Sequence, residues 1–475
     1  MRSSLSLVAA IALALSSIAS AATPPETRIP DAAFAHAGPL RDAALKDRTS
    51  WQVLESLTTE VGPRLAGSEA DARAVRWAEA KFKALGYDKV WLQPVTFPKW
   101  VRRSESAAVV GDHAQPLTLT ALGGSPAGTV EAEVVRFADL AALEAAPAGS
   151  LAGKIAFVDY RMERARDGSG YGPGSRVRSR GPSAAIRAGA AAFVMRSAGT
   201  DSHRNPHTGI TRFDDGLAPI PSAALSVPDA EQLARLVALD KPIRMRVALD
   251  CGWDGTATSH NVIGEVTGSH RTLRNEVVVI GGHLDSWDLG TGAVDDGAGV
   301  AITMGAGHLI AKLPKAQRPA RTIRVIAFAN EEQGLYGGKA YADAHKPDVA
   351  KHQLVAESDF GAGRIYAFNT GAAPHATTAA ARIAEALKPL GIEPMAKGGP
   401  GPDVGPIAAL GAAWAWLGQD GTDYFDLHHT PDDTLDKVDP AALAQNTAAY
   451  ATFAYLAASA EGGFGSAPKA ETTKP

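Results

Sequence analysis

The second half of the chain alternates between short apolar runs and longer amphipathic stretches. Four apolar runs predict strands, at Val277 to Ile280, Thr322 to Ala329, Leu354 to Glu357 and Ala413 to Leu417. Helical periodicity follows or separates them, near residues 298–312, 334–344, 374–387 and 440–458. Strands that alternate with helices predict an α/β fold, with a mostly parallel mixed sheet flanked by helices.

The first half has a different texture. Residues 51–86 show helical periodicity that ends at Gly86, a typical residue for a helix C-cap. A strand is predicted at Val90 to Val95, and we expect the segment Pro98 to Trp100 to end it. Short strands then alternate with glycine and proline, at Val130 to Phe137, Lys154 to Val158, Ala192 to Val194 and Arg244 to Leu249. One helix is predicted in this part, near Ser183 to Ala188.

These patterns predict a discontinuous catalytic domain. A chain of 475 residues is too long for one ordinary core. We expect the catalytic domain to comprise residues 40–117 and 251–462, with a β-rich inserted domain at 118–250. The Gly, Ser, Thr and Lys content beyond Glu461 predicts a disordered tail at 463–475.

The N-terminus is typical of a secretory signal peptide. Arg2 precedes the apolar run Leu5 to Leu15, and the small residues Ala19 to Ala21 follow it. The alternative is an uncleaved membrane anchor, but the apolar run is short for a bilayer. We therefore expect residues 1–21 to be removed and the protein to be secreted or periplasmic, without stable membrane insertion.

Charge and cysteine content exclude other classes. A formal net charge of -4 offers no basic patch for nucleic acid. Cys251 is the only cysteine, so the chain has no internal disulfide, and no candidate partner stands beside this thiol in the sequence. We interpret Cys251 as structural, which excludes a cysteine protease.

The glycine-rich segment 281–299 carries the strongest chemical signal. His283, Asp285, Asp295 and Asp296 follow directly on a predicted buried strand, and α/β sheets bind ligands where their strands end. Imidazole and carboxylate groups together suit zinc. Adjacent carboxylates repel each other unless a cation lies between them. The segment therefore resembles one half of a metal site.

Three other predicted strands end in residues of the same kind. Glu331 and Glu332 follow the second strand, Asp359 the third, and His428 and His429 come in the loop after the fourth. One such cluster alone is typical of a helix cap or a solvated turn. Because the ends of parallel strands share one edge of a sheet, we expect these groups to converge into a single metal centre.

The wording of these segments resembles a known family. His-Leu-Asp-Ser-Trp-Asp at 283–288, Glu-Glu-Gln-Gly at 331–334, Glu-Ser-Asp at 357–359 and the pair at 428–429 are similar to the co-catalytic zinc exopeptidases. This group includes bacterial leucyl aminopeptidases and glutamate carboxypeptidases, and the match is closest to the carboxypeptidase Q (plasma glutamate carboxypeptidase) family. The resemblance extends to residues 61–68, 206–210 and 220–223, and so covers nearly the whole chain after the signal. It implies that the insertion is a protease-associated domain and that the protein is a homodimer.

The resemblance also implies roles for single residues. Asp295 would bridge two zinc ions, of which His283 and Asp359 complete one and Glu332 and His429 the other. Glu331 would be the general base, and the Asp295–Asp296 peptide would be cis. Two cations need a shared anion, and together they lower the pKa of a water between them.

Other residues near these segments have predicted supporting roles. Asp285 lies two residues from His283, so we expect its carboxylate to accept the second imidazole N–H. Tyr424 and His428 are candidates for stabilising the oxyanion, with ordinary loop packing as the alternative. His203 and His207 are predicted to contact substrate or a second subunit rather than a second metal.

The leading hypothesis is a secreted dizinc exopeptidase that hydrolyses dipeptides or short peptides, with the carboxypeptidase activity that the resemblance implies. An aminopeptidase is the alternative, because the same metal core serves both activities. Histidine or arginine near the site would favour capture of an α-carboxylate, and an additional acid would favour capture of an α-amine. A non-catalytic binding protein on the same scaffold is a third hypothesis, against which the ligand positions and the base are all present.

Overall fold

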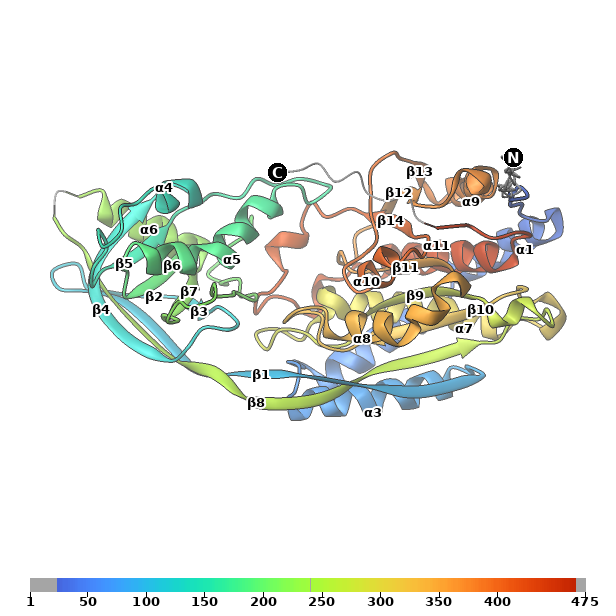
Figure 1. Cartoon of the computed structure of the whole chain (residues 1–475), viewed down its shortest axis with the longest axis horizontal. Helices are drawn as coiled ribbons and strands as arrows, with labels where there is room; N and C mark the ends of the chain where they lie inside the picture. Colours follow the sequence, from blue (N-terminus) through green and yellow to red (C-terminus); the bar gives the residue numbers. More distant parts are fainter. Residues whose placement is uncertain (1–23, 240, 467–475) are drawn as a thin grey trace, which may run out of the picture.

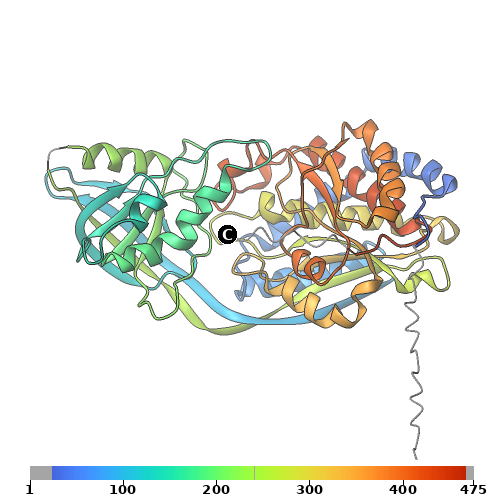
Figure 2. The same cartoon turned by 45° about the horizontal axis from the view of Figure 1, so that its top comes forward.

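A computed structural model describes residues 24–239 and 241–466. The predicted signal peptide at 1–21 lies outside these residues, as does 467–475. The molecule is elongated, with two lobes side by side along its long axis (Figure 1, Figure 2). Two long strands, β1 (Lys89–Val110) and β8 (Arg244–Val266), run from one lobe into the other. The two lobes are therefore joined by a ribbon of secondary structure.

The ribbon contains a difference from the sequence prediction. β1 and β8 pair antiparallel from Lys89 opposite Glu265 to Val110 opposite Arg244, with a register shift between Pro98 and Trp100. The prediction that a strand ends at Pro98 was wrong. Apart from β8, the described residues pair β1 only with β2 (Gln115–Leu117), at residues 107–109. Proline is tolerated in such an edge strand because its missing N–H interrupts no second ladder.

The larger lobe contains the predicted α/β sheet. β9 (Val277–His283) lies between β10 (Thr322–Phe328) and β11 (His352–Glu357) and runs parallel to both, whereas β10 pairs antiparallel with β8. The sheet is therefore mixed, and β9, β10 and β11 lie where the sequence predicts strands.

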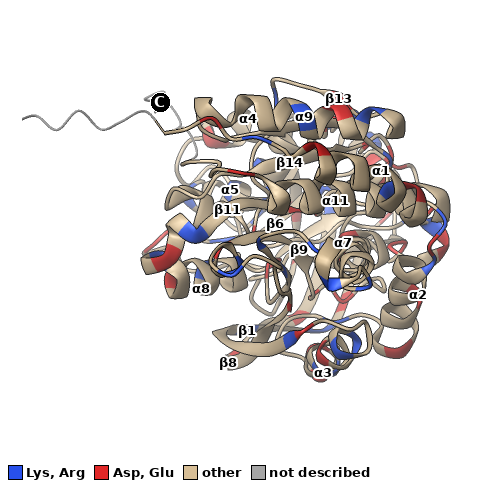
Figure 3. Cartoon of the chain, turned by 90° about the vertical axis from the view of Figure 1, so that its right-hand side faces the viewer, with Lys and Arg blue, Asp and Glu red and all other residues tan. Residues whose placement is uncertain are grey.

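Helices cover both faces of this sheet (Figure 3). One face packs against α7 (Ala298–Ala311), α11 (Pro440–Ser459), α1 (Asp31–Ala44), α2 (Thr49–Ser56) and α3 (Glu69–Ala84). The other face packs against α8 (Tyr336–His345) and α10 (Gly405–Ala409). Val278 and Ile280 of β9 point into the first core and Val277 and Val279 into the second. No helix among the described residues is both long and apolar enough to cross a bilayer.

Two predicted elements of this lobe differ in detail. The helix expected over 51–86 is split: α2 continues into a π turn at Leu57–Val61, and α3 begins only at Glu69. Gly86 has φ +81° and follows the end of α3, as a C-cap glycine does. The strand predicted at Ala413 to Leu417 is β14 (Ala415–Gln419), which belongs to a separate sheet with β12 (Ile365–Thr370) and β13 (Glu393–Pro394). Among the described residues, one isolated bridge, between Val355 of β11 and Trp414 just before β14, joins the two sheets.

The smaller lobe contains the other part of the same 11-stranded sheet and has its own core. The first half of β8 pairs with β4 (Gly128–Phe137), and β5 (Ile155–Val158), β6 (Ala192–Arg196), β7 (Ser222–Leu225) and β3 (Leu119–Ala121) follow in that order. The predicted strands are confirmed. The prediction of a single short helix was wrong, because this lobe contains α4 (Leu140–Glu144), α5 (Tyr171–Arg187) and α6 (Val227–Val237). Glycines and Pro182 within α5 disguise its length in the sequence. The lobe is α/β rather than β-rich.

The C-terminal segment is ordered beyond the predicted end of the catalytic domain. This segment follows α9 (Thr377–Leu387) and α11 in the chain, and its Phe464 side chain is fully buried in the main core. The Phe464 N–H donates to Gln353 Oε1 at 3.1 Å. The prediction that a disordered tail starts at residue 463 was therefore wrong, because the buried aromatic side chain of Phe464 anchors this glycine-rich segment.

Candidate metal centre

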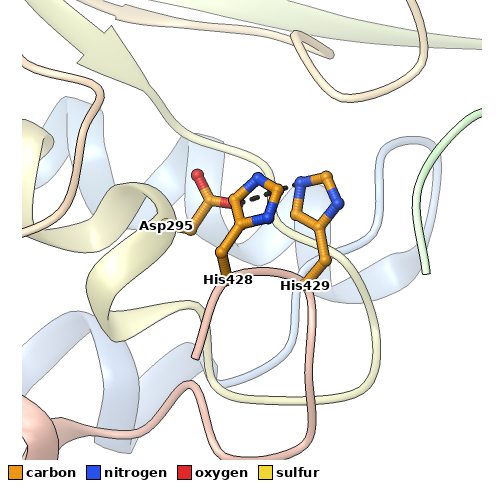
Figure 4. A group of neighbouring side chains, drawn as sticks. All are labelled: Asp295, His428 and His429. Atoms are coloured by element: carbon orange, nitrogen blue, oxygen red, sulfur yellow. Dashed lines mark ion pairs between the residues drawn. The ribbon is translucent and has the colours of Figure 1, made fainter. Parts of the chain in front are cut away.

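The predicted ligands converge at the strand ends of the larger lobe. Asp295 lies between two histidines, with its Oδ1 3.3 Å from His283 Nε2 and its Oδ2 3.1 Å from His429 Nε2. Figure 4 shows Asp295 beside His429 and the neighbouring His428. Asp359 Oδ1 lies 3.5 Å from His283 Nε2, and Glu332 Oε2 lies 2.9 Å from His429 Nε2. Each histidine thus faces the carboxylate of Asp295, which the two histidines share, and a second carboxylate of its own: Asp359 for His283 and Glu332 for His429.

His283 is fixed by its own neighbours in the loop. Its backbone N–H donates to Asp296 Oδ2 at 3.0 Å, and its ring Nδ1 lies 3.0 Å from the carbonyl oxygen of Asp285. Because a carbonyl can only accept, Nδ1 carries the proton and Nε2 presents its lone pair to the carboxylates.

Asp285 supports the site in a different way from the one predicted. Its carbonyl, rather than its carboxylate, accepts the imidazole N–H, and Oδ1 lies 3.8 Å from His283 Nδ1. Oδ1 instead accepts the N–H of Glu331 at 3.0 Å. One residue therefore positions both a histidine of the cluster and the predicted general base, because the strand end turns the carboxylate towards the neighbouring loop.

His429 is held by the smaller lobe. Its Nδ1 lies 3.2 Å from the carbonyl oxygen of Thr208, and the Thr208 N–H donates to the His429 carbonyl at 3.1 Å. These two bonds fix His429 in a left-handed backbone conformation with φ +61°, which is uncommon for a residue with a side chain. The sequence gives Thr208 no chemical signal of its own, although it lies in the segment 206–210 that contributes to the family resemblance.

Two further residues hold the loop of Asp295. Asp433 accepts the N–H of Val294 at 2.6 Å and the N–H of Asp295 at 3.2 Å. The fully buried Arg64 donates to the carbonyl oxygens of Leu284, Thr291 and Gly292. The Asp295–Asp296 peptide is cis, as the resemblance implies. Asp433 and Arg64 were missed, because a sequence does not reveal which carboxylate or guanidinium faces the backbone.

The electrostatics of the cluster fit a cation. Burial raises the pKa of Glu331 well above its usual range, and nearby Asp359 raises it further. Burial also raises the pKa of Glu332, whose Oε1 is buried without a hydrogen-bond partner among the described residues. Burial alone would lower the pKa of His429, but Glu332 and Asp295 raise it well above its usual range. Buried carboxylates of this number repel each other unless a positive charge compensates them.

The donor set is the one that zinc prefers. Imidazole nitrogen and carboxylate oxygen are its usual partners in proteins. Three overlapping groups offer one atom per residue within 4.8 Å of one another: His283, Asp295 and Glu332; Asp295, His428 and His429; and His283, Asp296 and Asp359. Both Asp296 oxygens already accept backbone N–H groups, from His283 and Gly299. Asp296 therefore holds the loop and is less available to an ion.

A cavity of about 350 Å³ opens onto the cluster. Asp295, Glu331, Glu332, Asp359 and His429 line it, and so do the predicted substrate contacts Tyr424 and His428. The ring of His428 stacks on that of His429 with centroids 3.5 Å apart, and burial lowers the pKa of His428 well below its usual range. His428 is therefore a neutral imidazole at the cavity wall.

The smaller lobe completes the cavity. Tyr171, Arg178 and Ile210 line it from that side, and the ring of Tyr171 stacks on Phe425 with centroids 4.5 Å apart. His203 and His207 do not line it. His207 is buried and its Nε2 lies 2.7 Å from Asp201 Oδ2, so the predicted substrate or subunit contact of His207 was wrong. The sequence could not distinguish a histidine that a nearby aspartate satisfies from an exposed one.

Comparison with known proteins agrees with this geometry. Residues 261–454 match Peptidase family M28. The chain is 32% identical to carboxypeptidase Q of Mus musculus over 412 residues, which cover 86% of this chain and 85% of that protein.

Solved structures give the same result for the fold. The Peptidase M28 precursor from Shewanella amazonensis SB2B superposes with a TM-score of 0.89 at 48% identity, over 92% of this chain and 99% of that chain. An aminopeptidase from Aneurinibacillus sp. strain AM-1 shares the fold, with a TM-score of 0.59 at 23% identity over 91% and 98% of the two chains. The fold and the buried cluster are those of a metallo-exopeptidase. Within that class, the chain belongs to peptidase family M28, in its carboxypeptidase Q-like group.

Proposed function

We propose that this protein is a zinc-dependent exopeptidase that hydrolyses dipeptides or short peptides with a pair of zinc ions, as a carboxypeptidase. The observation that carries the proposal is the placement of Asp295, whose two carboxylate oxygens face two different histidines. An aspartate so placed can be shared by two cations. The identity to carboxypeptidase Q over most of both chains supports the choice of substrate end.

The proposed ligands follow from the pairs of neighbouring side chains. His283 and Asp359 would hold one ion, Glu332 and His429 the other, and Asp295 would serve both. When bound, such a pair of ions polarises a peptide carbonyl and activates a water molecule. Without the ions, the same carboxylates are buried beside one another with too few positive partners, so the donor set fits the group it would hold.

Glu331 is the residue of the chain that moves the proton. Its backbone N–H is held by Asp285, and its side chain lines the cavity beside the cluster. Two adjacent glutamates can point to different places, so that Glu332 holds metal while Glu331 remains free. In the proposed mechanism Glu331 accepts a proton from the attacking water and delivers it to the nitrogen of the leaving amine.

The cavity walls orient the substrate and limit access of water. Tyr171, Phe360, Tyr424 and Phe425 line the cavity beside the cluster. Tyr424 and the neutral His428 are placed on this wall to donate a hydrogen bond to the carbonyl oxygen of the scissile bond. The inserted lobe, a protease-associated domain in this proposal, thus forms part of the substrate site.

An aminopeptidase is the second candidate. The acids around Glu331 would attract an α-amine, and a probable leucine aminopeptidase 2 of Aspergillus fumigatus is 26% identical over 64% of this chain. Dipeptides blocked at one end separate the candidates. Hydrolysis that tolerates an N-terminal block indicates a carboxypeptidase, tolerance of a C-terminal block an aminopeptidase, and tolerance of neither a strict dipeptidase.

The variant Glu331→Gln tests the mechanism. We expect turnover to fall by about 10²–10⁴-fold, because the proton carrier is lost, while zinc content stays at two ions per chain. Glu79→Gln, on the surface helix α3, is the matched control and should retain wild-type turnover. Unchanged turnover in Glu331→Gln would refute the role of Glu331. Fewer than two ions in fully active protein would refute the shared site.

Export and dimer formation are further parts of the proposal. The signal-like segment at Arg2 to Ala21 supports export, and the resemblance to carboxypeptidase Q supports a homodimer. Cell fractionation with N-terminal sequencing tests the first, and light scattering of the purified protein tests the second.

A further inference from the structure

A buried arginine connects two segments that hold the proposed metal ligands. Arg102 belongs to β1, and its side chain is only 8% exposed. Its Nε donates to the two carboxylate oxygens of Asp288, at 3.2 and 3.0 Å. Its Nη2 donates to Thr208 Oγ1 at 3.1 Å. One guanidinium group therefore binds both the loop that carries His283 and the residue of the smaller lobe that holds His429.

The remaining donors of Arg102 fix it to the smaller lobe. Its Nη1 donates to Glu105 Oε2 at 2.8 Å, to the carbonyl of Ala121 at 3.0 Å and also to Thr120 Oγ1. Glu105 Oε2 in turn accepts the N–H of Ala121 at 2.7 Å. Because all three nitrogens have partners, the guanidinium is held in one orientation. A lysine, with a single point of charge, could not make these contacts together.

The shorter connection to the metal centre leads to His429. Thr208 is fully buried, and its hydroxyl accepts from Arg102 and donates to the carbonyl of Ala121 at 2.8 Å. The carbonyl oxygen of the same threonine lies 3.2 Å from His429 Nδ1, and its N–H donates to the carbonyl of His429. Arg102 thus fixes the side chain of a residue whose backbone orients a proposed zinc ligand.

The longer connection leads to His283. Asp288 lies three residues beyond Asp285, whose carbonyl oxygen lies 3.0 Å from His283 Nδ1. Between them, Trp287 packs into the core of the smaller lobe, and Arg64 donates to the carbonyl of Leu284. This loop therefore has anchors of its own, and we expect it to depend less on Arg102 than His429 does.

We propose that Arg102 is a positioning residue that acts through Thr208 to fix His429, and so sets the affinity for the zinc ion of Glu332 and His429. Arg102 does not line the cavity of the metal centre, so it is not placed to touch substrate. The inference rests on the proposed dizinc site and names a residue outside that site. A histidine held at one ring nitrogen presents the other in a fixed direction, and loss of such an outer partner weakens metal binding.

The binding test measures zinc and not turnover. Metal-free full-length protein is titrated with zinc against a fluorescent chelator, which yields two dissociation constants. In Arg102→Met we expect the weaker constant to rise about 10-fold, the lower end of what loss of an outer partner costs, and the other to change less. Arg103→Met, the next residue in the chain, removes an exposed arginine that pairs with Asp250 and is the matched control. It should bind zinc as the wild type does.

A second variant assigns the affected ion. Glu332→Gln should retain mainly the ion of His283 and Asp359. In that protein Arg102→Met should change the remaining zinc affinity by much less than 10-fold. A full 10-fold loss there would show that Arg102 acts on the other ion, and it would overturn the proposal.

A double-mutant cycle tests the route through Thr208. Thr208→Val keeps the shape of the side chain and removes the hydroxyl that accepts from Arg102. If both residues act on one path, the loss of zinc affinity in the double variant stays well below the product of the two single losses. Losses that multiply would overturn the proposed route. Thr208→Val also carries the test if Arg102→Met does not fold.

Rescue by zinc separates positioning from damage to the fold. With limiting zinc, kcat of Arg102→Met should be below that of the wild type, and excess zinc should restore it with KM unchanged. A kcat that stays low at saturating zinc, or zinc affinities equal to those of the wild type, overturns the proposal. Equal weakening of both ions also overturns it, since a general loss of structure would act on both.

This inference and the proposed function can fail separately. If the wild type binds two zinc ions with the predicted response to Arg102→Met but hydrolyses no peptide, the exopeptidase function fails and the positioning role stands. If the wild type cleaves peptides and Arg102→Met binds zinc as tightly as the wild type, the positioning role fails and the exopeptidase function stands.

Discussion

The indole ring of Trp287 packs directly on Gly123, so closely that a Cβ atom at residue 123 would lie 2.2 Å from the ring. Trp287 comes from the loop that carries His283, and Gly123 belongs to the smaller lobe. The ring also lies edge-on to Trp100, with centroids 6.2 Å apart, and belongs to the apolar core of the smaller lobe. The loop of the metal centre is therefore anchored in the neighbouring lobe.

Gly123→Ala should disturb this anchor. The added methyl group meets a rigid aromatic ring, so we expect a loss of about 1–3 kcal/mol in the free energy of unfolding, from overpacking. We also expect lower zinc affinity, because Trp287 moves with the loop. Chemical denaturation and a zinc competition titration measure the two effects. Gly38→Ala in α1 is the control, because nothing beyond its chain neighbours and its own helix backbone lies within 4 Å of the added atom; since Pro39 follows, we expect no gain in stability, and zinc affinity should stay as in the wild type. Equal stability of the two variants would contradict this account.

Asp433 should be needed for metal binding although it faces only the backbone. It accepts two N–H groups, from Val294 and Asp295, and Asp433→Asn replaces one acceptor by a donor. We expect a loss of about 1–3 kcal/mol in stability, because a buried N–H loses its partner, and zinc content below that of the wild type. Asp432→Asn changes only a pair with Lys437 near the surface and should have little effect. Full zinc occupancy in Asp433→Asn would count against the positioning role.

Removal of metal should destabilise the folded protein. A ligand that binds only the native state stabilises it by about 4 kcal/mol at a thousand times its dissociation constant. Treatment with a chelator should therefore lower Tm, and added zinc should restore it. The restoration should be largely lost in His429→Ala, which removes a proposed ligand. The same Tm with and without chelator would indicate that the cluster binds no ion in solution.

His352 should make stability depend on pH well away from the metal centre. Burial, with the charge of Arg324, lowers the pKa of His352 to about 4. Its Nδ1 lies 3.2 Å from the carbonyl of Asp348, and the Tyr341 hydroxyl lies 2.8 Å from its Nε2, so the folded protein holds the neutral ring. The unfolded chain, with a pKa of about 6.5, binds a proton first as pH falls. The contribution of His352 to the free energy of unfolding is therefore complete at pH values well above 6.5 and is lost as pH falls towards 4. Between pH 7.5 and pH 5 this loss is about 2 kcal/mol.

His352→Asn should flatten that decline. The free energy of unfolding at pH 7.5 and pH 5, from urea titrations, measures the difference. His36→Asn, at an exposed position in α1, is the control and should keep the slope of the wild type. A steeper decline in His352→Asn than in the wild type would show that the sign is wrong.

The sequence predicts the sheet at the metal centre well, because the strands β9, β10 and β11 are buried on both faces and read as continuous apolar runs. The residues at their ends lie where the topology of a parallel sheet requires. His429 reaches the same place from the loop after β14, which belongs to a separate sheet. The predicted convergence of these side chains is therefore seen, although the predicted pairing of that strand was wrong.

The contributions of the smaller lobe could not be predicted. Thr208 acts through its backbone, and Arg178 is one of many arginines, so neither has a local pattern that separates it from a surface residue. The prediction of a strand end at Pro98 failed for a related reason. A proline ends a central strand but is tolerated in an edge strand, and whether a strand lies at an edge depends on the arrangement of the whole sheet. Arg64 is buried only because loops distant in sequence close around it.

The ribbon of β1 and β8 has a consequence for how the chain reaches its structure. Its pairs join residues far apart in sequence, Lys89 with Glu265 at one end and Val110 with Arg244 at the other. The two lobes are joined by these paired strands and not by a flexible linker. The β1–β8 pairs therefore cannot form until the polypeptide between the two strands is compact. Contacts of such long range slow folding, because the entropy of closing the loop is lost before the contacts form. We therefore expect a truncation at the predicted boundaries, 118 and 250, to cut through β8 and to leave residues 104–110 of β1 without their partners in β8, so that neither half can be obtained by simple excision.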